Sequence, residues 1–101
     1  MENPLSIPAI EHTLSTLPLD ARVKRLVLFG SHAKGSAQEH SDLDFFLDSG
    51  RRITGLAYFE LKGRLEDAFG CDVDLIPDVD LIAGSPVEKE IMRYGVTVYG
   101  G

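Results

Sequence analysis

The segment from residue 26 to residue 44 constrains the fold of this chain more than any other. An apolar run, Leu-Val-Leu-Phe at residues 26–29, ends directly at Gly30-Ser31, and Asp42-Leu43-Asp44 follows after ten further residues. The run reads as a buried strand, and Gly30 lets the backbone that follows it approach a ligand closely. Residues two apart on a strand point to the same face, so we expect Asp42 and Asp44 to converge on one site.

The two acids predict a divalent cation. Two like charges placed this close repel one another unless a cation lies between them. Mg²⁺ prefers carboxylate oxygens, waters and substrate phosphates as ligands. A third acid, Asp74, joins Asp42 and Asp44 if its strand lies beside theirs, although a shift in register would bring Asp72 there instead. Three carboxylates around two metal ions form a site suited to in-line transfer of a phosphoryl-type group.

The turn after the first strand is a candidate phosphate cradle. Gly30 allows close approach of the backbone, and Ser31 adds a hydroxyl and a backbone N–H. A helical turn that begins here would add a favourable dipole at its N-terminus. Lys34 is placed to reach a phosphate oxygen as a point charge.

The order of elements predicts an α+β chain, an α/β sandwich in which helices pack on a mixed β-sheet of about four strands. Periodicity and capping signals indicate helices at residues 6–17, 54–70 and 85–95 and strands at residues 23–29, 42–47, 71–76 and 96–99. The last helix is expected to turn Val87, Ile91 and Tyr94 inward.

Several polar side chains outside these motifs are expected mainly at the surface. His32 and His40 flank the loop that follows the first strand and are expected at the surface, with a lesser prospect of contact with nucleotide. Arg51 and Arg52 are expected in solvent at the end of the second strand, or in contact with an acceptor or partner. Residues 78–80 are expected to form a solvated loop.

Bulk properties bound the function. At 101 residues we expect one domain, residues 1–101, and the net charge of −6 disfavours stable binding to duplex nucleic acid. The longest apolar runs have four residues, so no membrane span is expected. A single cysteine, Cys71, forms no internal disulfide, and a reducing cytoplasm is the natural compartment.

The spacing of these motifs resembles the DNA polymerase β-like nucleotidyltransferase superfamily, in particular its minimal nucleotidyltransferase (MNT) proteins. The similarity spans roughly residues 23–76, and Ser-His-Ala-Lys-Gly at residues 31–35 resembles the family's Ser-x-Ala-Arg-Gly stretch, with Lys34 in place of the usual Arg. The resemblance implies transfer of AMP from ATP to an acceptor hydroxyl with two Mg²⁺ ions. It implies metal binding by Asp42, Asp44 and Asp74, and triphosphate binding by Gly30 and Ser31.

The resemblance also implies a partner. Small proteins of this family often accompany a HEPN-domain toxin, and in several pairs the MNT member is an antitoxin that adenylylates the toxin on tyrosine. Two alternatives stay open. One is a non-catalytic antitoxin that neutralises a HEPN partner by complex formation. The other is a nucleotidyltransferase for a small molecule, which usually carries an additional substrate domain.

Overall fold

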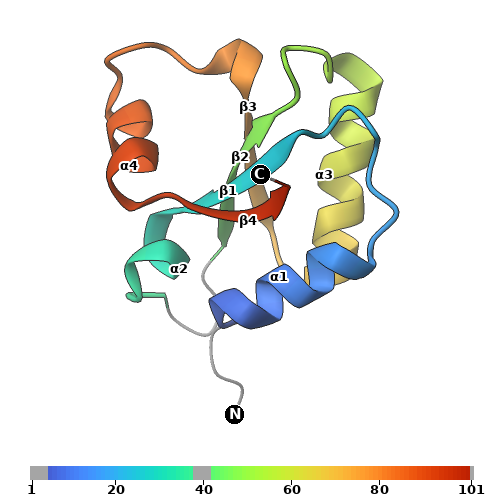
Figure 1. Cartoon of the computed structure of the whole chain (residues 1–101), viewed down its shortest axis with the longest axis horizontal. Coiled ribbons are helices and arrows are strands. Elements are labelled where there is room, and N and C mark those ends of the chain that lie inside the picture. Colours follow the sequence, from blue (N-terminus) through green and yellow to red (C-terminus); the bar gives the residue numbers. More distant parts are fainter. Residues whose placement is uncertain (1–4, 38–41, 101) are drawn as a thin grey trace.

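A four-stranded sheet forms the centre of the computed structural model, which describes residues 5–37 and 42–100 (Figure 1). The strands lie in the order β3-β2-β1-β4. Their bounds are β1 Arg25–Phe29, β2 Leu43–Asp48, β3 Val73–Pro77 and β4 Val96–Gly100. β1 pairs antiparallel with β2 and β4, whereas β2 and β3 are parallel. The predicted mixed sheet is therefore confirmed, with β3 and β4 at its two edges.

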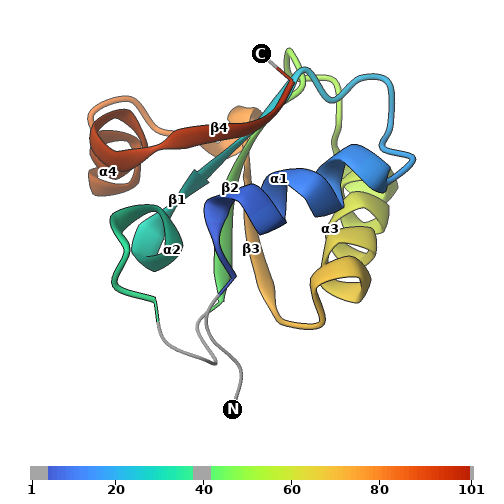
Figure 2. The ribbon, with the colours of Figure 1, turned by 60° about the horizontal axis from the view of Figure 1, so that its bottom comes forward.

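One face of the sheet carries the main hydrophobic core. Leu43, Phe45 and Leu47 of β2 alternate onto this face and are fully buried. They pack in one cluster with Leu14 of α1 (Ile7–Thr16) and Leu65 of α3 (Gly55–Phe69). Figure 2 shows these two helices on the same side of the sheet. The acids of β2 alternate with this apolar row, so they point to the other face.

The opposite face has a thinner cover. It is covered by α2 (Gly30–Lys34), the 3₁₀ helix η1 (Asp78–Asp80) and α4 (Pro86–Tyr94). Its smaller apolar cluster contains Val27, Phe29 and Phe46, against which Ile91 of α4 packs. The prediction that Val87 and Tyr94 also turn inward is wrong, because they stay 38% and 39% exposed. Of the three, Ile91 alone packs against this cluster.

The helix ends follow the sequence signals. Ser6 and Ser85 are the N-caps of α1 and α4, and each hydroxyl oxygen accepts a backbone N–H at 3.2 Å. α3 ends at Gly70 in a left-handed conformation with φ 67°. The predicted strands that start at residues 23 and 71 begin two residues later, at Arg25 and Val73. In the described part of the chain, no helix has the length and apolar character needed to cross a bilayer.

The free edge of β3 is in contact with α3. The backbone N–H of Val73 donates to Glu66 Oε2 at 3.2 Å, and the Tyr58 hydroxyl donates to the carbonyl of Leu75 at 2.6 Å. Both acceptor and donor side chains come from the same helix. This helix therefore fixes the position of the strand that carries Asp74.

Candidate active site

Pairing of β2 with β3 brings two of the predicted acids together. Asp44 and Asp74 are direct partners in the parallel register, and Leu43 pairs with Val73 on the preceding step. Asp42 stands one residue before β2 and is exposed. The register therefore puts Asp74, rather than Asp72, opposite Asp44.

The pKa of Asp44 shows the electrostatic consequence. This pKa is raised from 3.8 to about 6, first by partial burial and then by the neighbouring charges of Asp74 and Asp42. Within residues 5–37 and 42–100, the side chains of these three acids take part in no hydrogen bond or ion pair. The fold thus gathers negative charge here, which the positive charge of Lys34 opposes only in part.

Gly30 lies directly against the Asp44 carboxylate. β1 pairs with β2 so that Phe29 is opposite Asp44, and α2 begins at the next residue. Gly30 has a φ of +73°, and a Cβ added there would meet Asp44 Cγ at 2.9 Å and Oδ2 closer still. Both the conformation and the contact require glycine at this position. The start of α2 and the acids therefore form one continuous site.

The other two predicted phosphate ligands lie on α2 as well. Ser31 occupies the first turn of this helix and is half-buried. Lys34 forms an ion pair with Glu90 of α4, and its Nζ lies 5.2 Å from the centroid of the Tyr94 ring. The hydrogen bond with Glu90 raises the pKa of Lys34. Lys34 is near the acids but is engaged by α4.

Glu90 is a contributor that the sequence did not reveal. Its charge is among those that raise the pKa of Asp44, after burial, Asp74 and Asp42. It lies 46 positions beyond Asp44 in the chain, and the sequence pattern marks it only as one residue on the polar face of its helix. No local signal links it to the acids, because the contact depends on how α4 packs beside α2.

The expected surface position of His32 is wrong. Its side chain is only 8% exposed, and burial lowers its pKa, opposed by a hydrogen bond with the backbone of Asp42. His32 is thus buried close to the backbone of Asp42. The first turn of α2 turns this side chain inward, which a loop interpretation does not anticipate. His40 lies outside the described residues.

The expected solvated loop at residues 78–80 is also wrong in part. Asp78 is half-buried in η1, and its Oδ2 accepts the backbone N–H groups of Ser49 and Arg51 at 3.0 and 2.9 Å. Asp80 is exposed as expected, as are Arg51 and Arg52. Asp78 holds the turn after β2, at the opposite end of that strand from Asp42.

The donor chemistry of the acids suits magnesium. Asp42, Asp44 and Asp74 offer only carboxylate oxygens, and their mutual repulsion at Asp44 is what a bound cation would relieve. Among the described residues, no three Asp, Glu, His or Cys side chains are already grouped tightly enough to hold a metal.

The comparisons with known proteins decide the family. Residues 10–101 match the family described as Polymerase beta, Nucleotidyltransferase. The chain belongs to this family. A protein adenylyltransferase MntA from Thermococcus cleftensis is 32% identical over 98 residues, which cover 93% of this chain and 97% of that protein. The family resemblance and the nucleotidyltransferase fold predicted from the motifs are confirmed.

Two solved structures share the fold. The structure of a toxin-antitoxin with AMP-PNP contains a chain with a TM-score of 0.67 and 25% identity, and the match covers 96% of this chain and 75% of that one. A tri-AMPylated Shewanella oneidensis HEPN toxin in complex with an MNT antitoxin gives a TM-score of 0.62 at 21% identity, covering 94% and 73% of the two chains. The second likeness concerns the fold alone.

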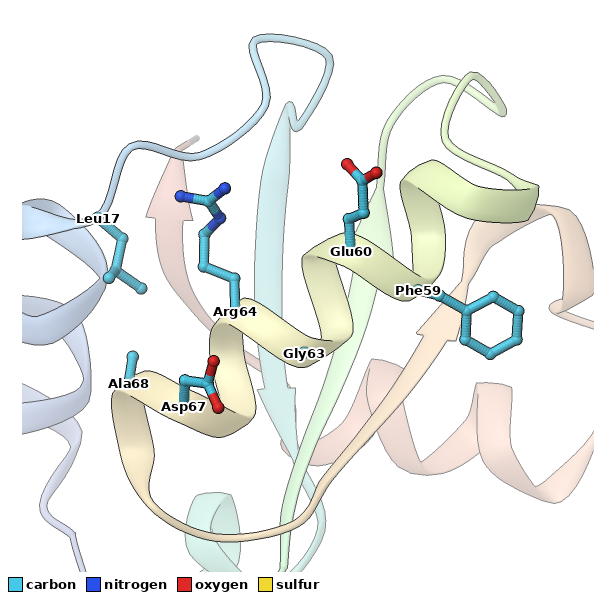
Figure 3. Close-up of a pocket in the computed structure, with 7 residues that line it drawn as sticks. All are labelled: Leu17, Phe59, Glu60, Gly63, Arg64, Asp67 and Ala68. Atoms are coloured by element: carbon cyan, nitrogen blue, oxygen red, sulfur yellow. The ribbon is translucent and has the colours of Figure 1, made fainter.

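A surface hollow elsewhere on the molecule is separate from the acids. It lies along α3 beside Leu17, and the close-up shows Glu60, Arg64 and Asp67 projecting from the exposed side of that helix (Figure 3). α3 packs on the core face of the sheet, whereas Asp44 points to the other face. This hollow therefore has no access to the candidate active site.

Proposed function

We propose that this chain is a protein adenylyltransferase that moves AMP from ATP to a hydroxyl group of a partner protein. The observation that carries the proposal is the pairing of Asp44 with Asp74 beside Gly30, where acids with no hydrogen-bond partner among the described residues meet the start of a helix. The Thermococcus relative bears this activity in its name, and the toxin-antitoxin structure was solved with an ATP analogue. Both support ATP as the donor.

The partner is proposed to be a HEPN-class toxin, with this chain as its antitoxin. The complex from Shewanella oneidensis pairs a HEPN toxin with an MNT antitoxin. We further propose that residues 1–101 act as a single minimal nucleotidyltransferase domain, so that the acceptor hydroxyl comes from another molecule. A cytoplasmic location, suggested by the single cysteine, belongs to the same proposal.

Each residue of the site has a distinct part in the proposed reaction. Asp42, Asp44 and Asp74 would hold Mg²⁺, proposed as two ions, which when bound neutralise phosphate charge and lower the pKa of a coordinated hydroxyl. The backbone of Gly30 and Ser31 would bind the triphosphate, as N–H groups at the start of a helix bind anions. Lys34 would add a positive charge after exchanging Glu90 for a phosphate oxygen.

The proposed transfer is a single displacement. The acceptor oxygen forms a bond to the α-phosphorus of ATP, and the bond from that phosphorus to the bridging oxygen of the β-phosphate breaks. Pyrophosphate leaves with the electron pair. Asp74 would take the hydroxyl proton. Because such a step depends mainly on positioning and charge neutralisation, three acids and a backbone cradle suffice.

A transfer assay tests the proposal. The chain is incubated with labelled ATP, Mg²⁺ and a candidate HEPN partner, and the partner is analysed by mass spectrometry. We expect the partner to gain AMP, and the gain to disappear when Asp42→Ala and Asp44→Ala are combined. Formation of a tight complex without transfer, unaffected by these substitutions, would favour the non-catalytic antitoxin instead.

A further inference from the structure

The exposed side of α3 carries large apolar side chains in solvent. Leu56 is 81% exposed and Phe59 is 66% exposed, one turn apart on this helix. Phe59 lies at one end of the hollow along α3, and Leu17 and Ala68 lie at its other end (Figure 3). Single exposed apolar residues are common, but two large ones beside a hollow are typical of a surface that another molecule covers. We call the exposed side of α3 from Leu56 to Ala68 the outer face of α3.

Gly63 lies in the middle of the outer face of α3, where the described part of the chain does not require glycine. Its backbone is helical, and a Cβ built there would meet no atom of the described residues within 4 Å. Glycine inside a helix is less favourable than alanine, because it loses more backbone freedom on folding. On a helix surface, however, glycine lets the axis of a second helix come closer. Gly63 therefore indicates that the molecule covering this face presents a helix to it.

Two charged residues of the outer face lack the ion pair that a neighbouring pair on the same helix forms. Lys62 and Glu66 are four positions apart and form an ion pair at 3.0 Å. Glu60 and Arg64 have the same spacing and are both exposed, yet neither has an ion-pair partner among the described residues. These two side chains are therefore available for opposite charges on another molecule.

The outer face of α3 is complementary to itself. A two-fold axis perpendicular to α3, level with the midpoint between Glu60 and Arg64, places a second copy of the helix antiparallel to the first. Each of these residues lies about 3 Å along the helix from the axis, so Glu60 of each copy comes opposite Arg64 of the other. Phe59 then lies beside the space at Gly63 of the second copy, and Leu56 comes level with Ala68. Charge and shape both favour this pairing.

The same arrangement supplies an acidic neighbour to the start of α3. The N-cap Thr54 makes no side-chain capping hydrogen bond, and the first turn of α3 contains no acidic residue. Asp67 comes level with Ala57 of the second copy, which lies in that first turn. A negative charge near a helix N-terminus is stabilising. The second copy thus provides what the helix lacks within its own chain.

We propose that the outer face of α3 binds a second copy of this chain in an antiparallel, two-fold dimer. α3 packs on the core face of the sheet, whereas Asp44 points to the other face, so the dimer leaves both candidate active sites uncovered. The dimer goes beyond the proposed function and does not depend on it, because its contacts include no residue of that site.

Sedimentation equilibrium of the whole chain and of two charge variants tests the dimer. Glu60→Arg and Arg64→Glu each put like charges opposite one another, so each should raise the dissociation constant of the dimer by about 100-fold. When the two variants are mixed, every pair across the interface again has opposite signs. We expect the mixture to form dimers that contain one copy of each variant. Charge effects within a single chain cannot produce this recovery.

Lys89→Glu is the matched control for Arg64→Glu. Lys89 is exposed on α4, so this substitution makes the same change in net charge away from the outer face of α3. It should leave the dissociation constant unchanged. Arg64→Glu should leave the rate of AMP transfer unchanged as well, since Arg64 lies outside the candidate active site. Equal weakening of the dimer by Lys89→Glu would attribute the effect to net charge and overturn the proposal.

Gly63→Leu gives a second test that does not depend on charge. Leucine favours the helix more than glycine does, so the midpoint of thermal unfolding should rise. The new side chain would block the close approach of the second helix, and the dimer should weaken about tenfold. A dimer of unchanged strength would contradict the antiparallel pairing.

Two further outcomes would overturn the proposal. One is an unmodified chain that stays monomeric up to about 500 μM, a concentration at which even weak specific dimers form. The other is a mixture of the two charge variants that stays monomeric although each variant unfolds cooperatively on heating. If Arg64→Glu instead abolishes binding of a HEPN partner by a monomeric chain, the outer face of α3 belongs to that partner.

Discussion

The two ends of β2 carry the same kind of residue in opposite circumstances. At the end of the strand, Asp48 accepts hydrogen bonds from Arg25 Nε at 3.0 Å and from the backbone N–H of Gly50 at 3.2 Å. Asp78 nearby accepts the N–H groups of Ser49 and Arg51. At the start of the strand, Asp44 has acidic neighbours and a pKa raised to about 6. Among the described residues, Asp48 and Asp78 therefore have hydrogen-bond donors that stabilise the fold, whereas the Asp44 carboxylate has none.

The largest difference in transfer rate should appear when one acid at the start of β2 and one at its end are replaced in separate variants. We expect Asp44→Asn to lower the rate of AMP transfer by about 10³-fold, the scale seen when a key electrostatic group is lost. Asp48→Asn should leave transfer within about twofold and cost on the order of 1 kcal/mol of stability, since its partner Arg25 is partly exposed. Transfer rates and urea unfolding measure both. Comparable losses of activity in the two variants would contradict the assignment of Asp44 to the active site and of Asp48 to the stability of the fold.

Asp44→Asn should also change how stability depends on pH. Because the folded pKa of Asp44 is above the unfolded value of 3.8, its unfavourable contribution is absent below about pH 4 and complete above about pH 6. Asp44→Asn should therefore raise the free energy of unfolding at pH 7.5, on the order of 1 kcal/mol after solvent screening, and leave it unchanged at pH 4. A gain that persists at pH 4 would contradict this origin.

An intermediate effect is expected at Gly30, which joins α2 to the acidic end. Gly30→Ala should reduce transfer by about 100-fold, because the new methyl group displaces the Asp44 carboxylate. Gly35→Ala is the matched control. Gly35 has a φ of +76° and no atom within 4 Å of an added Cβ. Its replacement by alanine therefore costs about 1 kcal/mol in backbone conformation and causes no steric clash. If both variants lose activity equally, backbone strain rather than the contact with Asp44 is responsible.

The smallest effect should come from the additional negative charge at Glu90. Glu90→Gln removes the ionic partner of Lys34 and one of the charges that raise the pKa of Asp44. We expect KM for ATP to fall about threefold, within the usual range for a partly exposed ion pair. Steady-state kinetics at several ATP concentrations measure this change. An increase in KM would show that Glu90 positions Lys34 for the nucleotide instead of competing with it.

The sequence predicted the parts of the fold that depend on local pattern. The alternation of side chains along the strand placed Asp42 and Asp44 on the face away from Leu43. Capping residues located α1 and α4. The choice between Asp72 and Asp74 needed the pairing of β2 with β3, which no single strand specifies. The burial of His32 and the approach of Glu90 to Lys34 and Asp44 arise from packing between helices distant in sequence.

The contacts of α3 with the edge of β3 have a consequence for association. An open strand edge offers unpaired N–H and carbonyl groups on which a foreign strand can add. Here Glu66 already accepts from Val73 and Tyr58 already donates to Leu75. Extension of the sheet by a second chain at this edge would first have to break both bonds. Glu66 and Tyr58 thus protect this edge from pairing with a strand of a second chain. A binding partner must therefore contact the side chains of β3 rather than its backbone.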